Sequence, residues 1–217
     1  MPGELQGRKV AILATDGVEQ IEMTEPWKAL EAAGVEVHLV SLKAGKIQGF
    51  NDLDKGDTFD VAVTVEQANA ADYVALVLPG GVANPDALRT NARAVSFVRE
   101  FMEADKPVAA ICHAAWLLVE ADAVRGRTLT SWPSLRTDIR NAGGDWVDKA
   151  VQVDQRLITS RKPEDLPQFC QRIVSEFGGR LEESRVDNMV EQTFPASDPL
   201  PSGMTIGDSA RGQAEAR

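Results

Sequence analysis

The sequence predicts a single α/β domain, built on a mostly parallel sheet with helices on both faces. Continuous apolar runs typical of buried parallel strands recur along the chain, as in Val10–Ala14 and Tyr73–Leu78. Stretches with helical periodicity separate these runs, which favours crossover connections between parallel strands. The chain has 217 residues, 43% of them hydrophobic, which is enough for one sizeable core.

The expected strands are short apolar or alternating runs, most of them bounded by Gly, Pro or Asp. They are Val10–Ala14, Val35–Leu42, Val61–Val65, Tyr73–Leu78, Pro107–Ile111, Thr128–Thr130, Trp146–Val153 and Arg156–Ser160. The expected helices carry apolar residues at helical spacing. They are Gln20–Ala33, Pro85–Ala104, His113–Ala121, Ser134–Ala142 and Leu166–Phe177. Residues 43–60, rich in Gly, Asp and Lys, are expected to form loops or a short excursion.

Composition divides the chain into a domain, residues 1–178, and a C-terminal tail, residues 179–217. The tail is polar, contains Gly, Pro and Ser, and lacks a sustained apolar period. Within it, Val190–Pro195 contains Phe194, which is able to dock on the domain or on another subunit. A solvated tail is the alternative, and composition favours it.

Charge and cysteine content exclude several classes of protein. The net charge is −10 and no Lys/Arg run is present, which argues against nucleic acid and against anionic membranes as partners. Two cysteines are too few for a disulfide framework and too scattered for a metal site. The N-terminus has no apolar signal core, and no apolar run approaches spanning length. We therefore expect a cytoplasmic protein with no metal and no cofactor.

Cys112 is the candidate nucleophile. It lies between the buried strand Pro107–Ile111 and the following helix, the layout of a nucleophile elbow. Such a turn needs small residues two places either side of the nucleophile, and Ala110 and Ala114 occupy those places. The helix dipole at this point is expected to favour the thiolate and so to lower the pKa of the cysteine.

A cysteine after an apolar strand is often only a small buried hydrophobe. The strand-to-helix junction and the adjacent histidine favour the reactive alternative for Cys112. For Cys170, which lies between Phe169 and Ile173 on the last expected helix, the structural interpretation is favoured.

The chain has only two histidines, which restricts the choice of a base. His38 lies within an expected strand and faces either solvent or a helix. His113 is therefore the candidate imidazole base, although neighbours in a tight turn point in different directions and the sequence does not assure a Cys112–His113 hydrogen bond. Asp86, after the Gly80–Gly81 turn, is the candidate carboxylate that orients it.

Two acids at the first expected helix are candidates for the pocket. Glu22 heads a helical stripe that is otherwise apolar, where burial lets it keep its proton and donate a hydrogen bond to a thiolate. Equally, it is a first-turn acid that offsets the helix dipole, and Glu19 has the same two interpretations. Gly80 and Gly81 end a neighbouring strand, so their backbone N–H groups are candidates for an oxyanion hole.

Six segments together resemble the PfpI-type intracellular cysteine protease family, within the superfamily of the parkinsonism-associated deglycase. They are Val10–Ala14, Asp16–Glu22, Leu76–Gly81, Lys106–His113, Arg125–Pro133 and Asn141–Asp148. The resemblance covers about residues 8–178. Where the family usually has Cys-His-Gly-Pro this chain has Ala114 and Ala115 after His113, and Trp132 stands where a Tyr is often found before proline.

The resemblance implies a flavodoxin-like three-layer sandwich, similar to class I glutamine amidotransferases, that forms homodimers or larger homo-oligomers. It also implies Cys112 as nucleophile, Glu22 as the acid beside the thiol, and His113 as base. Asp86 would then be a carboxylate supplied by the adjacent subunit. Trp132 and the two alanines would alter the wall of the pocket.

Three functions share this arrangement of residues. The first is a stress-response cysteine hydrolase, a peptidase or a glyoxalase or deglycase, acting on a small carbonyl or peptide substrate. The second is a non-enzymatic redox sensor or chaperone with an oxidisable Cys112. The third, glutamine amidotransfer, needs a histidine well downstream of the elbow. None follows His113, so it is rejected.

Overall fold

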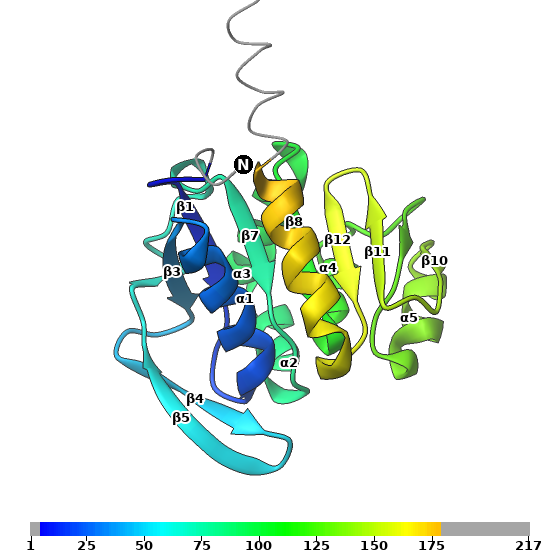
Figure 1. Ribbon diagram of the computed structural model, residues 1–217. Coiled ribbons are helices and arrows are strands. Elements are labelled where there is room, and N and C mark those ends of the chain that lie inside the picture. Colours follow the sequence, from blue (N-terminus) through cyan, green and yellow to red (C-terminus); the bar gives the residue numbers. More distant parts are fainter. Residues whose placement is uncertain (1–4, 179–217) are drawn as a thin grey trace, which may run out of the picture.

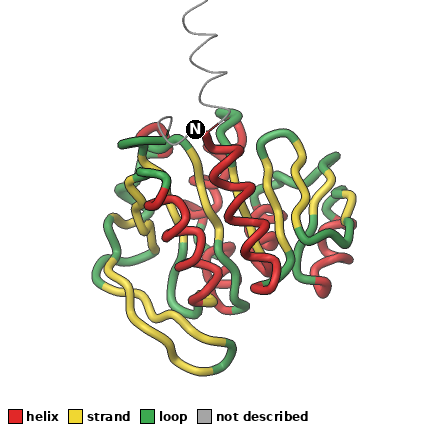
Figure 2. The backbone as a smooth tube through the Cα atoms, viewed as in Figure 1, coloured by secondary structure: helices red, strands yellow, loops and turns green. Residues whose placement is uncertain are grey.

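A computed structural model of the chain describes residues 5–178. A central sheet lies between two layers of helices (Figure 1), and the strands run side by side through the middle of the molecule (Figure 2). Helix α1 and a final helix over residues 166–178 cover one face, and α2 to α5 lie on the other. This is the expected α/β sandwich.

The central sheet has seven strands in the order β11-β12-β8-β7-β1-β3-β6. Neighbouring strands are parallel except for β11 and β12, which are antiparallel. The bounds are β1 Lys9–Leu13, β3 Glu36–Ser41, β6 Val63–Thr64, β7 Ala75–Leu78, β8 Val108–Ile111, β11 Val151–Asp154 and β12 Leu157–Ser160. Since β1, β7 and β8 are parallel neighbours, their carboxyl ends share one edge, where ligands bind in open α/β sheets.

The helices are short, and each buries some of its side chains in the fold. Their bounds are α1 Gln20–Ala32, α2 Ala83–Arg89, α3 Ala92–Glu103, α4 Ala115–Glu120 and α5 Arg136–Asn141. Of α3, Phe97 and Phe101 are fully buried against one sheet face, and Phe169 and Phe177 of the final helix are buried against the other. Two hydrophobic clusters therefore hold the sheet between them.

The central strands contribute side chains to both clusters. In β1, Ala11 and Leu13 belong to the cluster under α3, whereas Val10 and Ile12 belong to the cluster under α1. All four side chains are fully buried. Burial on both faces explains why these segments are continuous apolar runs, and it confirms the parallel strands predicted from them.

Of the two alternatives predicted for residues 43–60, loops are wrong and a short excursion is correct. These residues form a hairpin of β4 (Lys46–Asn51) and β5 (Asp54–Asp60), and β4 also pairs with the short strand β2 (Val18–Glu19). The hairpin projects from the sheet (Figure 1) and five of the seven β5 residues are exposed, so the sequence lacks the apolar alternation of a half-buried strand. Ile47 is the hairpin side chain that is fully buried.

Other expected elements also differ in their bounds. The expected helix Pro85–Ala104 is two helices, because Asn91 caps α3 by accepting a hydrogen bond from Ala94 N at 3.0 Å. Trp146–Val153 contains two separate strands, β10 (Asp145–Trp146), which pairs with β9 (Thr128–Leu129), and β11. The strand at Val61–Val65 is reduced to β6, and the helix after Cys112 begins at Ala115 rather than at His113.

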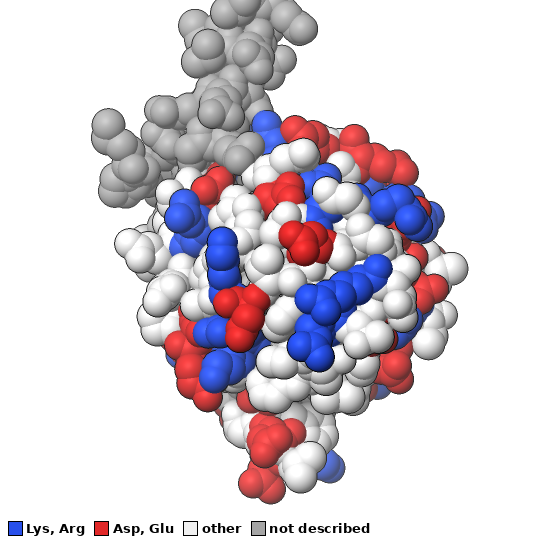
Figure 3. Space-filling model, turned by 90° about the vertical axis from the view of Figure 1, so that its right-hand side faces the viewer, with Lys and Arg blue, Asp and Glu red and all other residues white. Residues whose placement is uncertain are grey.

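The tail, residues 179–217, and with it Val190–Pro195, lies outside the described residues. Within residues 5–178, no helix is long and apolar enough to cross a membrane. On the face of the molecule drawn in Figure 3, acidic and basic side chains are interspersed rather than gathered into one basic stripe.

Candidate active site

The carboxyl edge of the sheet contains a cavity of about 670 Å³. Among its lining residues are five of the predicted site residues, which come from distant parts of the chain: Glu19, Glu22, Cys112, His113 and Trp132. The predicted Gly81 lines it as well. The fold therefore brings most of the predicted candidates together at one site.

Cys112 lies directly after β8 in a strained backbone conformation. Its φ is 62°, in the left-handed region that non-glycine residues seldom adopt. The residue starts a short 3₁₀ turn, Cys112–Ala114, that leads into α4. Only 7% of the residue is exposed, and it lines the cavity. This geometry matches the predicted nucleophile elbow.

His113 contacts the thiol directly, which the sequence did not assure. Its Nδ1 lies 3.2 Å from Cys112 Sγ, and its Nε2 lies 3.4 Å from Ser134 Oγ. The ring stacks on Trp132, with centroids 5.7 Å apart, and tilts against Trp116 at 5.2 Å. Burial lowers the pKa of His113, so the imidazole is neutral near pH 7 and able to accept a proton.

Glu22 lies in the first turn of α1, and it is fully buried. Its Oε2 accepts a hydrogen bond from Gly80 N at 3.0 Å, and the carboxyl is within hydrogen-bonding reach of the Cys112 thiol. Burial is the main cause that raises the pKa of Glu22 to about 8. Of the two interpretations of Glu22, the geometry therefore favours an acid that keeps its proton beside the thiol over a solvated acid that offsets the helix dipole.

The expected lowering of the thiol pKa is wrong. Burial raises the pKa of Cys112, and the Glu22 carboxylate raises it further, whereas the backbone amides of His113 and Gly81 lower it. Helix α4 begins three residues later and has only six residues, so its dipole does not replace the hydration that the thiol has lost. A neutral thiol therefore faces a neutral imidazole.

The Gly80–Gly81 turn fits tightly between the acid and the thiol. A Cβ on Gly80 would lie 2.5 Å from Glu22 Oε2 and 2.8 Å from Cys112 Cβ, so only glycine is accommodated. Gly81 has a φ of 77° and its amide reaches the thiol. Asn84, fully buried, holds the turn by donating to Pro79 O at 2.9 Å and Gly80 O at 3.0 Å.

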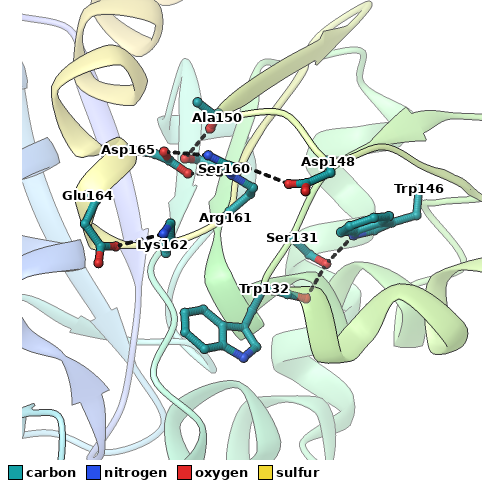
Figure 4. Close-up of polar contacts among 10 residues, drawn as sticks. All are labelled: Ser131, Trp132, Trp146, Asp148, Ala150, Ser160, Arg161, Lys162, Glu164 and Asp165. Carbon is teal, nitrogen blue, oxygen red and sulfur yellow. Dashed lines mark hydrogen bonds and ion pairs between the residues drawn. The ribbon is translucent and has the colours of Figure 1, made fainter.

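Trp132 forms one wall of the cavity, and its backbone is fixed from two sides. Its N–H donates to Cys112 O at 3.2 Å. Its carbonyl accepts a hydrogen bond from Ser131 Oγ at 2.9 Å, and Ser131 Oγ in turn accepts from Trp146 Nε1 at 3.0 Å (Figure 4). These contacts keep the indole stacked on His113.

Of three further residues considered for the site, Glu19 lines the cavity, whereas Asp86 and His38 do not. Asp86 is exposed on the first turn of α2, and within residues 5–178 no hydrogen bond joins it to His113. Glu19 lines the cavity, and its Oε2 accepts a hydrogen bond from Asp52 N at 3.0 Å; burial raises its pKa. His38 contacts Tyr73 and Glu36 on and beside β3, as expected for a histidine outside the site.

Other lining residues were not predicted. Phe50, Asp52 and Leu53 belong to the hairpin, and Val82 follows the glycine turn. For the hairpin residues, the sequence signal was a short Ile-Gln-Gly-Phe alternation at residues 47–50, within a stretch whose composition resembles a loop. Asn84 gave no signal, because a polar residue near a helix start is ordinary.

Cys170 lies on the final helix, packed against the cluster under α1, and burial raises its pKa to about 11. It is not among the cavity residues. Among residues 5–178, no group of three or more His, Cys, Asp or Glu side chains is placed to hold a metal ion.

A model of the DJ-1/PfpI family matches residues 8–176 of the chain. This chain belongs to the DJ-1/PfpI family. General stress protein 18 of Bacillus subtilis is 43% identical over 167 residues, which are 75% of this chain and 94% of that protein. Protein/nucleic acid deglycase 2 of Escherichia coli is 41% identical over 167 residues, which are 75% of this chain and 93% of that protein.

Solved structures agree with the DJ-1/PfpI assignment. A two-domain protein of Anabaena variabilis, with a DJ-1/ThiJ/PfpI-like and a ferritin-like domain, superimposes with a TM-score of 0.75 and 39% identity. The match covers 79% of this chain and 48% of that chain, so this chain spans about half of it. The predicted resemblance and the flavodoxin-like fold are therefore confirmed.

Proposed function

We propose that this DJ-1/PfpI domain is a cysteine hydrolase that acts on a small carbonyl or peptide substrate through Cys112. One observation carries the proposal. Cys112 has a strained backbone and lines a cavity of about 670 Å³, and the imidazole Nδ1 of His113 lies 3.2 Å from its sulfur. Strain of this kind is concentrated at functional sites, and the contact is within reach for proton transfer.

The first step is attack of Cys112 Sγ on the substrate carbonyl carbon. A carbon–sulfur bond forms, the carbonyl π pair moves to oxygen, and the thiol proton passes to His113 Nδ1. The neutral imidazole suits this role, because a thiol with a raised pKa needs a base at the moment of attack. The amides of Gly81 and His113, which already reach the sulfur, stabilise the oxyanion.

The second half of the reaction returns the proton. For a peptide, the imidazolium donates its proton to the leaving amine, the carbon–nitrogen bond breaks, and a thioester remains on Cys112. Water then attacks the thioester, with His113 as base, and the thiol is released. For an α-oxoaldehyde such as methylglyoxal, the imidazolium returns its proton to the oxyanion and gives a hemithioacetal. A proton shift from the thiol-bearing carbon to the neighbouring carbonyl carbon converts this adduct into a 2-hydroxyacyl thioester, which water hydrolyses in the same way. A role in stress response is supported by the name of the Bacillus relative, and deglycase chemistry by the name of the Escherichia relative.

A redox sensor or chaperone is the alternative function of the same thiol. Glu22 beside Cys112 is suited to donate a hydrogen bond to an oxidised sulfur. However, an exposed thiol without a cleft would suit a sensor, and here the residue is only 7% exposed and faces a cavity. The enzyme is therefore favoured.

Alkylation tests this function. We expect the Cys170→Ala protein to turn over methylglyoxal or a fluorogenic peptide amide, and to lose turnover in proportion to iodoacetamide labelling of Cys112. Peptide mapping by mass spectrometry measures the labelling. Turnover that survives complete labelling, or no turnover of either substrate, would overturn the hydrolase, and clean oxidation of Cys112 by peroxide without turnover would favour the sensor.

We further propose that His113 receives its orienting carboxylate, Asp86, from a second copy of the chain in a homodimer or larger ring. Among residues 5–178 of one chain, Asp86 is exposed, and the hydrogen-bond partner of His113 Nε2 is the hydroxyl of Ser134 at 3.4 Å. Asp86 lies at the start of α2, close in sequence to the cavity residues Val82 and Ala83. Its exposed carboxylate is therefore available to the cavity of a neighbouring subunit.

Subunit mixing tests this arrangement. His113→Ala and Asp86→Ala chains are each expected to be inactive alone. After co-refolding, mixed dimers combine the intact His113 of one chain with the intact Asp86 of the other, so about a quarter of wild-type turnover should return. Absence of recovery in mixed dimers verified by native mass spectrometry would contradict a shared site.

A further inference from the structure

The tip of the β4–β5 hairpin is held firmly against the start of α1. Glu19 Oε2 accepts a hydrogen bond from Asp52 N at 3.0 Å. The Gln20 amide binds Asp57 twice, accepting from its N–H at 2.6 Å and donating to its carboxylate at 2.8 Å. Because Glu22 lies two residues beyond Gln20, these contacts fix the hairpin tip relative to the acid beside the thiol.

The charged side chains in the described lining of the cavity are both acidic. They are Glu19 and Asp52, since the raised pKa of Glu22, about 8, keeps that carboxyl protonated near pH 7, and no Lys or Arg belongs to the described lining. Glu22 Oε1 is buried and has no hydrogen-bond partner among the described residues, so it adds an unsatisfied acceptor at the same cavity. The field inside the cavity therefore attracts cations and repels anions.

Apolar side chains surround the same mouth. Leu53 at the hairpin tip is 88% exposed, Val82 is 57% exposed and Trp132 is 37% exposed, and all three line the cavity. These are three of the four large hydrophobic side chains that are exposed among residues 5–178. Their concentration at one cavity indicates that an apolar part of a ligand covers them.

We propose that the hairpin tip, Asp52 and Leu53, selects the substrate, favouring a carbonyl or acyl compound with a positively charged group beside an apolar group over its anionic counterpart. This inference rests on the hydrolase proposed above. Asp52 supplies the attraction at the mouth, and Leu53 packs against the apolar group. The role is one of specificity, since among residues 5–178 no hydrogen bond joins either residue to Cys112 or His113.

A matched pair of substrates tests the selection. N-acetyl-leucyl-lysine and N-acetyl-leucyl-glutamate nitrophenyl esters differ in charge but present the same reactive carbonyl. We expect wild-type kcat/KM to be about tenfold higher for the lysine ester, and Asp52→Asn to reduce this ratio about threefold. Asn tolerates the left-handed φ of 57° at this position, so the substitution removes charge without disturbing the turn.

Asp54→Asn is the matched control, because Asp54 is an exposed acid on the same hairpin that does not line the cavity. Its ratio should equal that of the wild type. Leu53→Ser should lower kcat/KM for both esters alike and leave their ratio unchanged. Equal wild-type kcat/KM for the two esters would overturn the inference and leave the hydrolase standing. The same lysine-to-glutamate ratio in Asp52→Asn as in Asp54→Asn would have the same meaning. No turnover of either ester would overturn the hydrolase and the inference with it.

Discussion

Cys112→Ala is expected to reduce kcat/KM for methylglyoxal and for peptide substrates about a thousandfold or more. The reason is that the sulfur forms the bond to the carbonyl carbon, and no other nucleophile among residues 5–178 is hydrogen-bonded to His113 Nδ1. The fold should remain intact, since the substitution removes one buried sulfur atom. Steady-state kinetics and circular dichroism on the same preparations measure both quantities.

Cys170→Ala is the matched control for this substitution. Cys170 is the other cysteine of the chain, partly buried and outside the cavity. Its replacement should leave kcat/KM within about twofold of the wild type, at a small stability cost. Equal activity of the two variants would show that the thiol at the elbow is structural.

Glu22→Gln is expected to stabilise the folded chain near pH 7 by up to about 3 kcal/mol. The pKa of Glu22 is about 8 in the folded chain, against an ordinary value of 4.5 when unfolded. Between these values the folded chain binds more protons than the unfolded chain, so the stability of the wild type falls as the pH rises through this window. Glutamine keeps an acceptor for Gly80 N–H and has no proton to lose.

Urea unfolding at pH 5, 6, 7 and 8 measures the effect. The stability difference between Glu22→Gln and wild type should be small at the lowest pH and should grow as the pH rises. Glu31→Gln, an exposed acid on the same helix that accepts a hydrogen bond from Trp27, should differ from wild type by less than about 0.5 kcal/mol throughout. A difference for Glu22→Gln that does not change with pH would contradict the buried carboxyl acid.

The sequence predicts the position of a site residue best where that position follows from the order of strands and helices along the chain. Cys112 was placed at an elbow because an apolar strand ends there, and Glu22 because it heads an apolar helix face. Both positions depend on local pattern and on the rule that parallel strands share an edge. The contact between Cys112 and His113 was not predictable, since it depends on the φ of 62° at the cysteine.

What the sequence could not provide depends on contacts between distant segments. The thiol pKa was expected to fall because the helix dipole is a local feature, whereas the burial that raises it comes from the whole fold. The hairpin tip was missed for a similar reason. Asp52 and Leu53 are exposed, so their composition resembles a loop. Contacts with distant residues bring them to the cavity, namely Asp52 with Glu19 and Asp57 with Gln20.

The most direct test of the role of Cys112 is to identify the atom that carries substrate during turnover. The protein is mixed with an excess of an activated acyl ester, quenched in acid within the first turnover, and mapped by peptide mass spectrometry. The account predicts one acyl group per chain, attached to Cys112, and much slower acylation when His113 is replaced by alanine, because the thiol then lacks the base that takes its proton during attack. Turnover without an acyl group on Cys112, or with the group on Cys170, would contradict it.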